Sequence, residues 1–328
     1  CKAPYYEYLV KMIDPVKLTF ITARESQTEI TNYYLHTTIK KKTSEKALTS
    51  FTNPYTGLEG VNRQKITYKR EDGINLSGDL YLPKGYDPAR DGALPVLMWA
   101  YPIEYKSAAD ASQVRGSKNT FTRPNYGSPV LWVTRGYAVL DNAEMPIVGE
   151  NGKEPNDNFI PQLYLNAHAA IQTLANMGVG DSTRVAVGGH SYGAFMTANL
   201  LAHTNLFKAG IARSGAYNRT LTPFGFQGEE RTYWEAPEVY NSMSPFAYAD
   251  KIKTPLLLIH GDADNNTGTF PLQSERLFSA MKGLGGTVRY VSLPFESHGY
   301  SAKENILHML WETDQWLEKY VKGVKSEK

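Results

Sequence analysis

The hydrophobic pattern of the chain changes near residue 60. Before that point, short β-branched and aromatic runs at Lys17–Thr22 and Asn32–Thr37, and a weaker one at Lys46–Phe51, are separated by polar turn residues. This pattern predicts a meander of strands without helices. Because two or three strands with an exposed face are not stable alone, we expect them to belong to a larger β structure. The residues Asn53–Gly57 predict a linker after the meander.

Beyond residue 63, short apolar runs alternate with longer segments that repeat their apolar residues every three to four positions. The short runs predict strands at residues 64–68, 76–82, 94–100, 136–141, 185–187, 207–212, 255–260 and 288–293. The longer segments predict helices at residues 158–177, from 192 onward, at 270–284 and at 302–321. This alternation predicts a mostly parallel sheet of the α/β class, with an antiparallel hairpin at its start around the turn Glu71–Gly73.

Composition excludes several classes of function. The 328 residues are 41% hydrophobic, enough for a sizeable core, and their formal net charge is +2. This nearly balanced charge gives no indication of binding to nucleic acid or to a membrane surface, and no apolar run approaches the ~20 residues of a membrane span. The single cysteine, Cys1, allows no internal disulfide. The sequence assigns no compartment, although export to the periplasm would be consistent with it in a bacterium.

Residues 185–198 carry the most specific chemical motif. An apolar run leads into Gly189-His190-Ser191-Tyr192-Gly193, and a stretch rich in helix formers follows. Gly-x-Ser-x-Gly between a strand and a helix is typical of a nucleophile elbow, in which a tight turn presents the serine hydroxyl to a base. The start of the helix directs free N–H groups at the place where an oxyanion would form. The alternative is a glycine-rich turn before a surface helix.

A serine nucleophile needs a base and an orienting carboxylate, which follow it along the chain in this arrangement. His298 lies in the loop between the last strand and the last helix, whereas His308 lies inside that helix, so we expect His298 to be the base. The segment His260–Asp264 offers two carboxylates at the end of its strand, Asp262 and Asp264, and spacing does not separate them. No histidines or cysteines are spaced as a metal site requires, so we expect no metal.

Several segments together resemble the prolyl oligopeptidase family of serine peptidases: Gly188–Asn199, Leu258–Asn266 and Glu296–Tyr300. Further segments are similar to its glutamyl endopeptidase branch: Trp99–Lys106, Ala212–Phe226 and Trp311–Trp316. The resemblance implies an α/β-hydrolase fold with a mostly parallel central sheet. It also implies a peptide as the substrate and a reaction without a cofactor.

The same resemblance assigns roles to individual residues. In the family the acid is the fourth residue after the strand-end histidine, which selects Asp264 over Asp262. The family's second oxyanion donor is a tyrosine hydroxyl just after the long apolar strand. That position matches Tyr101, which would act together with the backbone N–H of Tyr192. The alternative for Tyr101 is an aromatic residue that only packs in the core.

Members of this family carry an N-terminal β-propeller that restricts entry to peptides. The meander resembles its last blade, so we expect residues 1–55 to be a β-strand remnant of a propeller with its linker, and residues 56–328 to be the catalytic domain. Because the other blades are missing from the sequence, we expect a processed or truncated form. The missing propeller segment and further copies of the chain stay open as partners, whereas nucleic acid and membranes do not.

An acidic substrate side chain would need a cation in the enzyme, because a buried carboxylate without a partner is costly. We expect Arg219 to bind it, since this residue falls where relatives that cut after proline carry a pocket-lining aromatic. Arg213 and Arg231 are the reserves. For all three arginines the alternative is a structural ion pair that ties loops together.

Two other classes of protein would use or retain the same residues. A carboxylesterase, or a dipeptidyl or acylaminoacyl peptidase, would act through the same three side chains, although the polar stretch 213–241 argues against the lipophilic lid of an esterase. A non-catalytic binding domain would have lost Ser191, Asp264 or His298, and all three are present.

Overall fold

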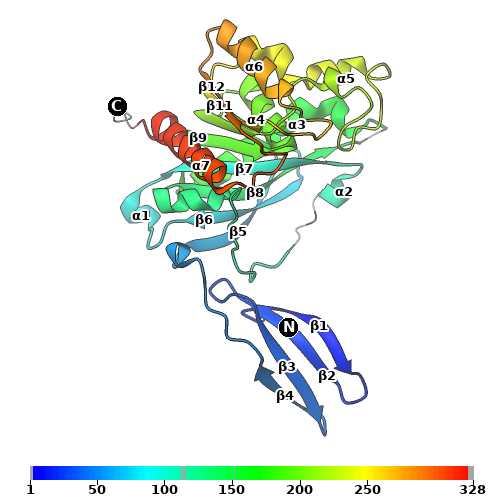
Figure 1. Cartoon of the computed structure of the whole chain (residues 1–328), viewed down its shortest axis with the longest axis vertical. Coiled ribbons are helices and arrows are strands. Elements are labelled where there is room, and N and C mark those ends of the chain that lie inside the picture. The colour runs from blue at the N-terminus through cyan, green and yellow to red at the C-terminus, as the bar shows by residue number, and fades with distance from the viewer. Residues whose placement is uncertain (1–2, 112, 114–115, 151, 324–328) are drawn as a thin grey trace.

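The structure is a computed structural model that describes residues 3–111, 113, 116–150 and 152–323. Cys1 lies outside the described residues. Figure 1 shows a small sheet at the N-terminal end and a larger body of strands and helices, joined by an extended segment. The strands of the two bodies form two separate sheets.

The small sheet is an antiparallel meander in which each strand pairs with the next. Its strands are β1 (Tyr6–Asp14), β2 (Thr19–Glu25), β3 (Asn32–Ile39) and β4 (Lys42–Ala47). The strands predicted at 17–22 and 32–37 are confirmed, but the run at 46–51 is wrong as a strand. Lys40 and Lys41 adopt φ angles of 48° and 64° and turn the chain directly from β3 into β4. The last strand therefore begins at Lys42, earlier than predicted, and it ends at Ala47.

The strand β1 is absent from the sequence prediction because its apolar residues do not alternate. Leu9 and Val10 are neighbours, as are Met12 and Ile13, and all four are exposed in the described structure. A half-buried strand would instead show apolar residues at every second position.

The larger body contains an eight-stranded sheet in the order β12-β11-β10-β9-β7-β8-β6-β5. Its strands are β5 (Asn62–Lys69), β6 (Asn75–Leu82), β7 (Leu94–Tyr105), β8 (Ala138–Val148), β9 (Gly180–His190), β10 (Ala209–Arg213), β11 (Leu256–Gly261) and β12 (Val288–Leu293). The β5–β6 and β6–β8 pairs are antiparallel, and the remaining pairs are parallel. This confirms the mostly parallel sheet with an antiparallel hairpin at its start.

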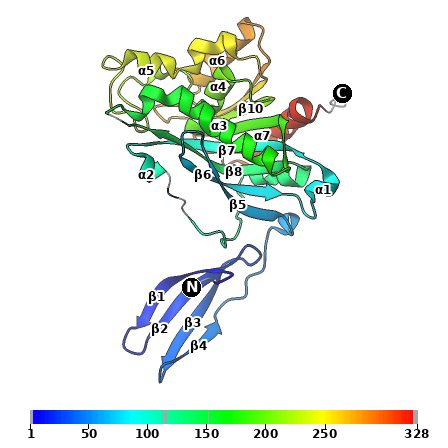
Figure 2. The same cartoon turned by 180° about the vertical axis from the view of Figure 1, so that it is seen from behind.

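Helices cover both faces of this sheet (Figures 1 and 2). The α-helices are α1 (Pro88–Asp91), α2 (Ala108–Ala111), α3 (Phe159–Asn176), α4 (Tyr192–His203), α5 (Pro237–Ser242), α6 (Leu272–Gly283) and α7 (Lys303–Leu317). The 3₁₀ helices are η1 (Thr56–Leu58), η2 (Pro129–Arg135), η3 (Pro155–Asn158), η4 (Arg219–Leu221) and η5 (Pro245–Lys251), and η6 (Glu318–Lys322) is a π-helix.

The two faces have separate cores. Leu163 of α3, Phe195 of α4 and Leu277 of α6 belong to one buried cluster, and Met309 of α7 and Trp132 of η2 belong to the other. The four helices that the sequence predicts are confirmed as α3, α4, α6 and α7. The short helices α1, α2 and α5 are not predicted, because they are too short to show a repeat of apolar residues. No helix in the described ranges combines the length and apolar character that a membrane crossing requires.

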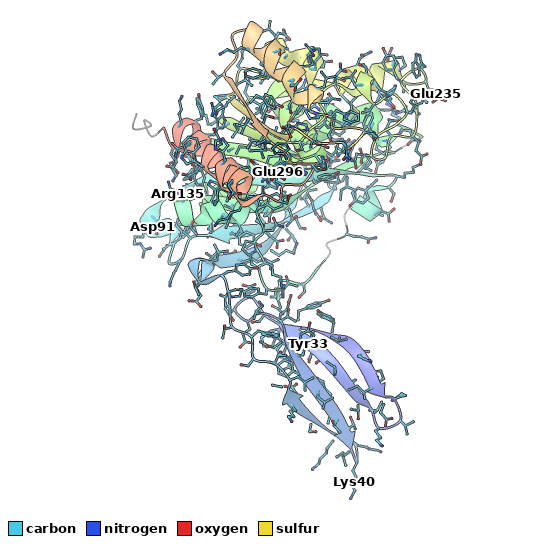
Figure 3. The ribbon with its side chains drawn as sticks, in the orientation of Figure 1. Tyr33, Lys40, Asp91, Arg135, Glu235 and Glu296 are labelled. Atoms are coloured by element: carbon cyan, nitrogen blue, oxygen red, sulfur yellow. The ribbon has the colours of Figure 1, made fainter. Side chains whose placement is uncertain are left out.

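Residues 117–123 hold the small sheet against the larger body. Glu25 at the end of β2 pairs with Arg123, and Gln27 donates a hydrogen bond to the carbonyl of Lys118 at 2.8 Å. Asn119 donates to the carbonyl of Ala3 at 3.0 Å. Figure 3 shows Lys40 at the far tip of the small sheet, away from these contacts.

Candidate active site

Ser191 occupies the turn between β9 and α4 in a backbone conformation that residues other than glycine rarely adopt, with φ 58° and ψ −116°. Its N–H donates to the carbonyl oxygen of Arg213 on β10 at 2.8 Å. Its own carbonyl accepts from the N–H groups of Ala194 and Phe195 at 3.0 and 3.1 Å. The strained turn is therefore held by the neighbouring strand and by the first turn of the helix.

Two glycines allow the strand and the helix to approach this closely. A Cβ on Gly189 would lie 2.6 Å from the Cα of Gly193, and a Cβ on Gly193 would overlap the carbonyl oxygen of Ala100 within β7. Side chains at these positions would push α4 away from the sheet. The predicted elbow geometry is present around Ser191.

His298 and Asp264 meet across 34 residues of chain. Nδ1 of His298 lies 2.8 Å from Oδ2 of Asp264, the carboxylate is fully buried, and the imidazole is 25% exposed. Asp262 is occupied elsewhere, since it accepts a hydrogen bond from the N–H of Phe295 at 2.6 Å. The fold thus brings Asp264 to the imidazole.

Three further groups hold the carboxylate of Asp264. Nε2 of His260 lies 3.0 Å from Oδ2, the hydroxyl of Thr269 donates to the same oxygen at 3.2 Å, and the N–H of Asn266 donates to Oδ1 at 2.9 Å. Burial raises the pKa of Asp264, but the hydrogen bonds from His260, His298 and Asn266 outweigh it and hold this pKa at about 2. The ionised carboxylate can therefore fix the tautomer of His298 at neutral pH.

The loop that carries His298 is fixed by the buried carboxylate of Glu296, which is labelled within the larger body in Figure 3. This carboxylate accepts from the N–H groups of Ser301 and Ala302 at 2.8 Å each. The carbonyl oxygen of Glu296 accepts from the N–H of Ala263 at 2.9 Å. The loop of the acid and the loop of the imidazole are thus joined through the main chain.

His190 links this pair to the turn of Ser191. The ring centroids of His190 and His298 are 4.7 Å apart. Burial, together with the charges of Arg213 and His298, lowers the pKa of His190 to about 3, so it is uncharged at neutral pH. Among the described residues, the imidazole of His298 is hydrogen-bonded to Asp264 and Thr269, and no hydrogen bond joins it to the hydroxyl of Ser191. The hydroxyl of Ser191 is close enough to Tyr101 to lower the pKa of its phenol.

Tyr101 lies within β7, which continues to Tyr105, and 43% of its surface is exposed, so it is not a residue that only packs in the core. Its ring centroid lies 5.8 Å from that of Tyr192. Partial burial raises the pKa of its phenol, and contacts with Gln227 and Ser191 lower it. The N–H of Tyr192 opens α4, and it has no hydrogen-bond acceptor among the described residues. Two donors therefore flank the hydroxyl of Ser191.

Ser191 also lines a cavity of about 480 Å³. Its other walls are Tyr192, Arg219, residues 221–227 and the loop Asn266–Thr269. The cavity therefore begins at the predicted nucleophile and is closed by segments from distant parts of the chain.

Arg219 is the buried cation of this cavity, with 4% of its surface exposed. Its guanidinium carbon lies 4.0 Å from the ring centroid of Phe195 and 4.3 Å from that of Phe226. Its Nε has no hydrogen-bond partner, and among the residues that the structure describes no carboxylate forms an ion pair with it. Burial lowers the pKa of Arg219 to about 10, which leaves it charged at neutral pH.

Arg213 lies outside this cavity. Its guanidinium stacks 4.2 Å from the ring centroid of Trp99 and donates to the carbonyl of Gly127 at 2.7 Å. It lines a separate hollow together with His190.

Arg231 is held in ion pairs. It donates two hydrogen bonds of 2.8 Å to Glu229 and one of 2.8 Å to Asp157. Of the three predicted arginines, the fold therefore brings Arg219 to the cavity of Ser191 and holds the other two elsewhere.

Sequence reasoning missed several residues around the site. His260 could have been found, because it ends an apolar strand four residues before Asp264, and a buried histidine needs polar partners. Gln227 and Glu104 carry no such signal, because only the tertiary fold brings the loop of Gln227 to Tyr101 and the side chain of Glu104 on β7 to Tyr192.

One group of residues with metal-ligating side chains occurs in the described part of the chain, formed by Glu7, His36 and Glu45 on the small sheet. Arg24 already forms ion pairs with both carboxylates. Because their charge is neutralised within the protein, this group makes a poor cation site.

Comparison with known proteins places these residues in a family. Residues 164–324 match the sequence profile of the prolyl oligopeptidase family, and this segment contains Ser191, Asp264 and His298. Over this segment, which is just under half of the 328 residues, the chain is similar to the prolyl oligopeptidase family. The resemblance drawn from the sequence motifs is confirmed.

Two plant relatives of the family extend the similarity to 97% of the chain. The proteins named "Probable glutamyl endopeptidase, chloroplastic" from Oryza sativa subsp. japonica and from Arabidopsis thaliana are 53% and 52% identical to it over 328 residues. The chain spans 35% and 34% of their lengths, about a third.

Solved structures of more distant proteins share the fold. Dipeptidyl peptidase 4 from Porphyromonas gingivalis has a TM-score of 0.71 at 17% identity, over 96% of this chain and 43% of that chain. Acylaminoacyl peptidase from Pyrococcus horikoshii has a TM-score of 0.69 at 20% identity, over 96% of this chain and 50% of that one. These similarities confirm the predicted α/β-hydrolase fold.

Proposed function

We propose that the chain is a serine peptidase that hydrolyses peptide bonds after glutamate through an acyl-enzyme. The observation that carries this proposal is the buried, unpaired guanidinium of Arg219 in the cavity that Ser191 lines. The names of the two plant relatives agree with it.

In this mechanism Ser191 is the nucleophile, His298 the general base and Asp264 the residue that orients the imidazole. Because Nδ1 of His298 is held by Asp264, Nε2 is the ring nitrogen that takes the proton from Oγ of Ser191. His298 takes the proton as Oγ attacks the carbonyl carbon, and then gives it to the departing amine. In the second half of the reaction, His298 takes a proton from water as the water oxygen attacks the acyl carbon. It then returns the proton to Oγ of Ser191, which leaves as the acyl product is released.

The oxyanion that forms during the attack is stabilised by two donors. These are the phenol of Tyr101, from β7, and the N–H of Tyr192 at the positive end of the α4 dipole. Both donors are positioned before the substrate arrives, so little reorganisation is needed during the reaction.

Arg219 binds the side-chain carboxylate of the substrate's glutamate. The aromatic rings of Phe195 and Phe226 exclude water from the guanidinium, and a charge pair in such a site is stronger than in water. Asparagine, glutamine and alanine side chains would leave the buried cation unpaired, which is costly.

We also assign residues 1–55 to a propeller blade with its linker and residues 56–328 to the catalytic domain. The four antiparallel strands β1–β4 match the usual unit of a propeller blade. The exposed apolar residues Leu9 and Ile13 of β1 support a neighbouring blade that would cover them.

The variant Arg219→Ala tests the preference for glutamate. We expect kcat/KM for a Glu-X peptide to fall about 100-fold or more, because a buried charge pair is lost, and kcat/KM for an Ala-X peptide to change little. Equal losses on both peptides would remove Arg219 from the substrate pocket. Arg231→Ala is the matched control, and it should keep the wild-type ratio because Arg231 pairs with Glu229.

Labelling by a fluorophosphonate tests the catalytic roles separately from specificity. Ser191→Ala should abolish labelling, and Asp264→Asn should slow it at least ~100-fold, whereas Asp262→Asn should label at nearly the wild-type rate. Hydrolysis of short acyl esters without peptide cleavage would favour a carboxylesterase over a peptidase.

A further inference from the structure

Glu104, at the end of β7, is a carboxylate beside the Arg219 cavity that the proposed mechanism does not use. Its Oε1 accepts a hydrogen bond from the hydroxyl of Tyr192 at 2.6 Å. The backbone of Gly228 closes over it, since a Cβ on that glycine would lie 2.9 Å from the Cβ of Glu104. Among the described residues, no lysine, arginine or histidine pairs with this carboxylate.

The ring of Tyr192 separates Glu104 from Arg219. Tyr192 is 2% exposed, and its ring centroid lies 5.2 Å from the guanidinium carbon of Arg219 while its hydroxyl contacts Glu104. A partly buried carboxylate and a buried cation therefore lie on either side of one aromatic ring. In the described structure neither has an opposite charge in direct contact, although each favours the ionised form of the other.

We propose that Glu104 is the counter-charge that sets how strongly the Arg219 cavity prefers an ionised glutamate. In the empty cavity the charge of Glu104 partly compensates that of Arg219. When the substrate carboxylate pairs with Arg219, Glu104 becomes a neighbour of like charge and takes up one proton from solvent. This inference rests on the proposed role of Arg219.

The groups that face Glu104 determine when it accepts that proton. They are Tyr192 from α4, Arg219 from η4, Tyr101 from β7 and the N–H of Gly228. Burial raises the pKa of Glu104 above that of an exposed glutamate, although Tyr192 and Arg219 lower it in part. Burial also raises the pKa of both tyrosines above that of a free phenol, so Glu104 is the group among these that can take up a proton when the substrate carboxylate binds.

The direction of the pH effect follows from proton uptake. Below the pKa of Glu104 in the empty cavity, its carboxyl is neutral in both states and a substrate glutamate binds most strongly. Glu104 has a higher pKa when the cavity is occupied than when it is empty. Between these two pKa values, binding of a substrate glutamate weakens by up to about tenfold for each unit by which the pH rises. Above both values, binding is weak and constant.

The first experiment measures kcat/KM for matched Glu-X and Gln-X peptides between pH 5 and 9 (roughly the range in which a raised carboxyl titrates). The ratio of the two cancels the titration of the catalytic groups. In the wild type the ratio should fall with rising pH and then level off. In Glu104→Gln it should stay at its high, acidic value, about tenfold above the wild type at the alkaline end. Glu230→Gln, which removes an exposed charge two residues from Gly228, should match the wild type.

The second experiment measures proton uptake directly. A peptide ending in glutamate is titrated calorimetrically into Ser191→Ala in two buffers of different ionisation enthalpy. We expect uptake of up to one proton per site in the pH window where the ratio falls. The double variant Ser191→Ala/Glu104→Gln should take up none. If Glu104→Gln does not fold, Tyr192→Phe replaces it. Loss of the phenol donor should move the window to higher pH, because that hydrogen bond lowers the pKa of Glu104.

The outcomes separate this inference from the proposed function. Suppose that Arg219→Ala selectively loses Glu-X cleavage. The role of Glu104 would then be overturned by a ratio that does not depend on pH, by the absence of proton uptake, or by a pH window that Tyr192→Phe does not move. Equal losses of Glu-X and Ala-X cleavage in Arg219→Ala would instead overturn the pocket itself.

Discussion

At the scale of single residues, the fold keeps His190 uncharged although it lies beside the guanidinium of Arg213 and the ring of His298. Burial is the main cause, and Arg213 and His298 add to it. This matters for the proposed mechanism, because His298 becomes an imidazolium at each transfer of the acyl group. A second cation against its ring would raise the energy of that state.

The uncharged state of His190 predicts a loss of stability in acid. Its pKa is about 3 in the folded chain and near 6.5 when unfolded, so between these values only the unfolded state binds the proton. The free energy of unfolding should therefore fall as the pH is lowered, by about 1.4 kcal/mol per pH unit from this residue. Urea titrations of the wild type and of His190→Gln between about pH 6 and pH 4 measure the difference. Parallel stability curves would contradict the prediction.

At the scale of secondary structure, the site depends on how closely α4 approaches the sheet. The turn at Ser191 joins β9 to α4, and the loops that follow β11 and β12 carry Asp264 and His298 to the same edge. The carboxyl ends of parallel strands are the usual place for ligands in such sheets.

The variant Gly189→Ala tests this packing. Its methyl group would lie 2.6 Å from the Cα of Gly193, so α4 must move. We expect a destabilisation of roughly 2–4 kcal/mol and a fluorophosphonate labelling rate at least ~100-fold below the wild type. Gly283→Ala, at the end of α6 where a Cβ would meet nothing within 4 Å, is the control. Wild-type labelling by Gly189→Ala would show that the close approach is dispensable.

The sequence was most informative where local rules act alone. The apolar run before Ser191 and the glycines around it predicted the strand, the turn and the helix, because each depends on neighbouring residues. Spacing could not choose between Asp262 and Asp264, since the choice depends on how the loop after β11 folds. The sequence also could not show that the side chain of Arg213 stacks on Trp99 while that of Arg219 lines the cavity of Ser191. Tertiary packing determines where each of these side chains points.

At the scale of the whole molecule, the small sheet is attached to the larger body through few polar contacts. Buried Glu25 pairs with Arg123, and it also accepts from the hydroxyl of Thr31 and the N–H of Phe121. Burial raises the pKa of Glu25, but these hydrogen bonds outweigh it and keep the carboxylate ionised. This carboxylate therefore connects β2 to the segment that docks on it.

The variant Glu25→Gln should loosen this attachment. Loss of a charged hydrogen-bond acceptor costs about 1.5–3 kcal/mol at the contact, so limited proteolysis between residues 48 and 55 should proceed several-fold faster. The unfolding midpoint of the larger body should stay unchanged, because its core does not include Glu25. Glu29→Gln, exposed in the same turn, is the matched control. Equal proteolysis rates in all three proteins would show that other contacts hold the small sheet.

The first turn of α4 rests directly on the carbonyl oxygen of Ala100, with no space for a methyl group between them. Ala100 immediately precedes Tyr101 in the chain. The spacing between the start of α4 and the backbone of β7 beside Tyr101 is therefore fixed by main-chain atoms, which cannot repack as side chains do. Replacing residue 101 will therefore change the side chain that faces the substrate but not the position of its Cα, and moving α4 away from β7 will require rebuilding the backbone on both sides.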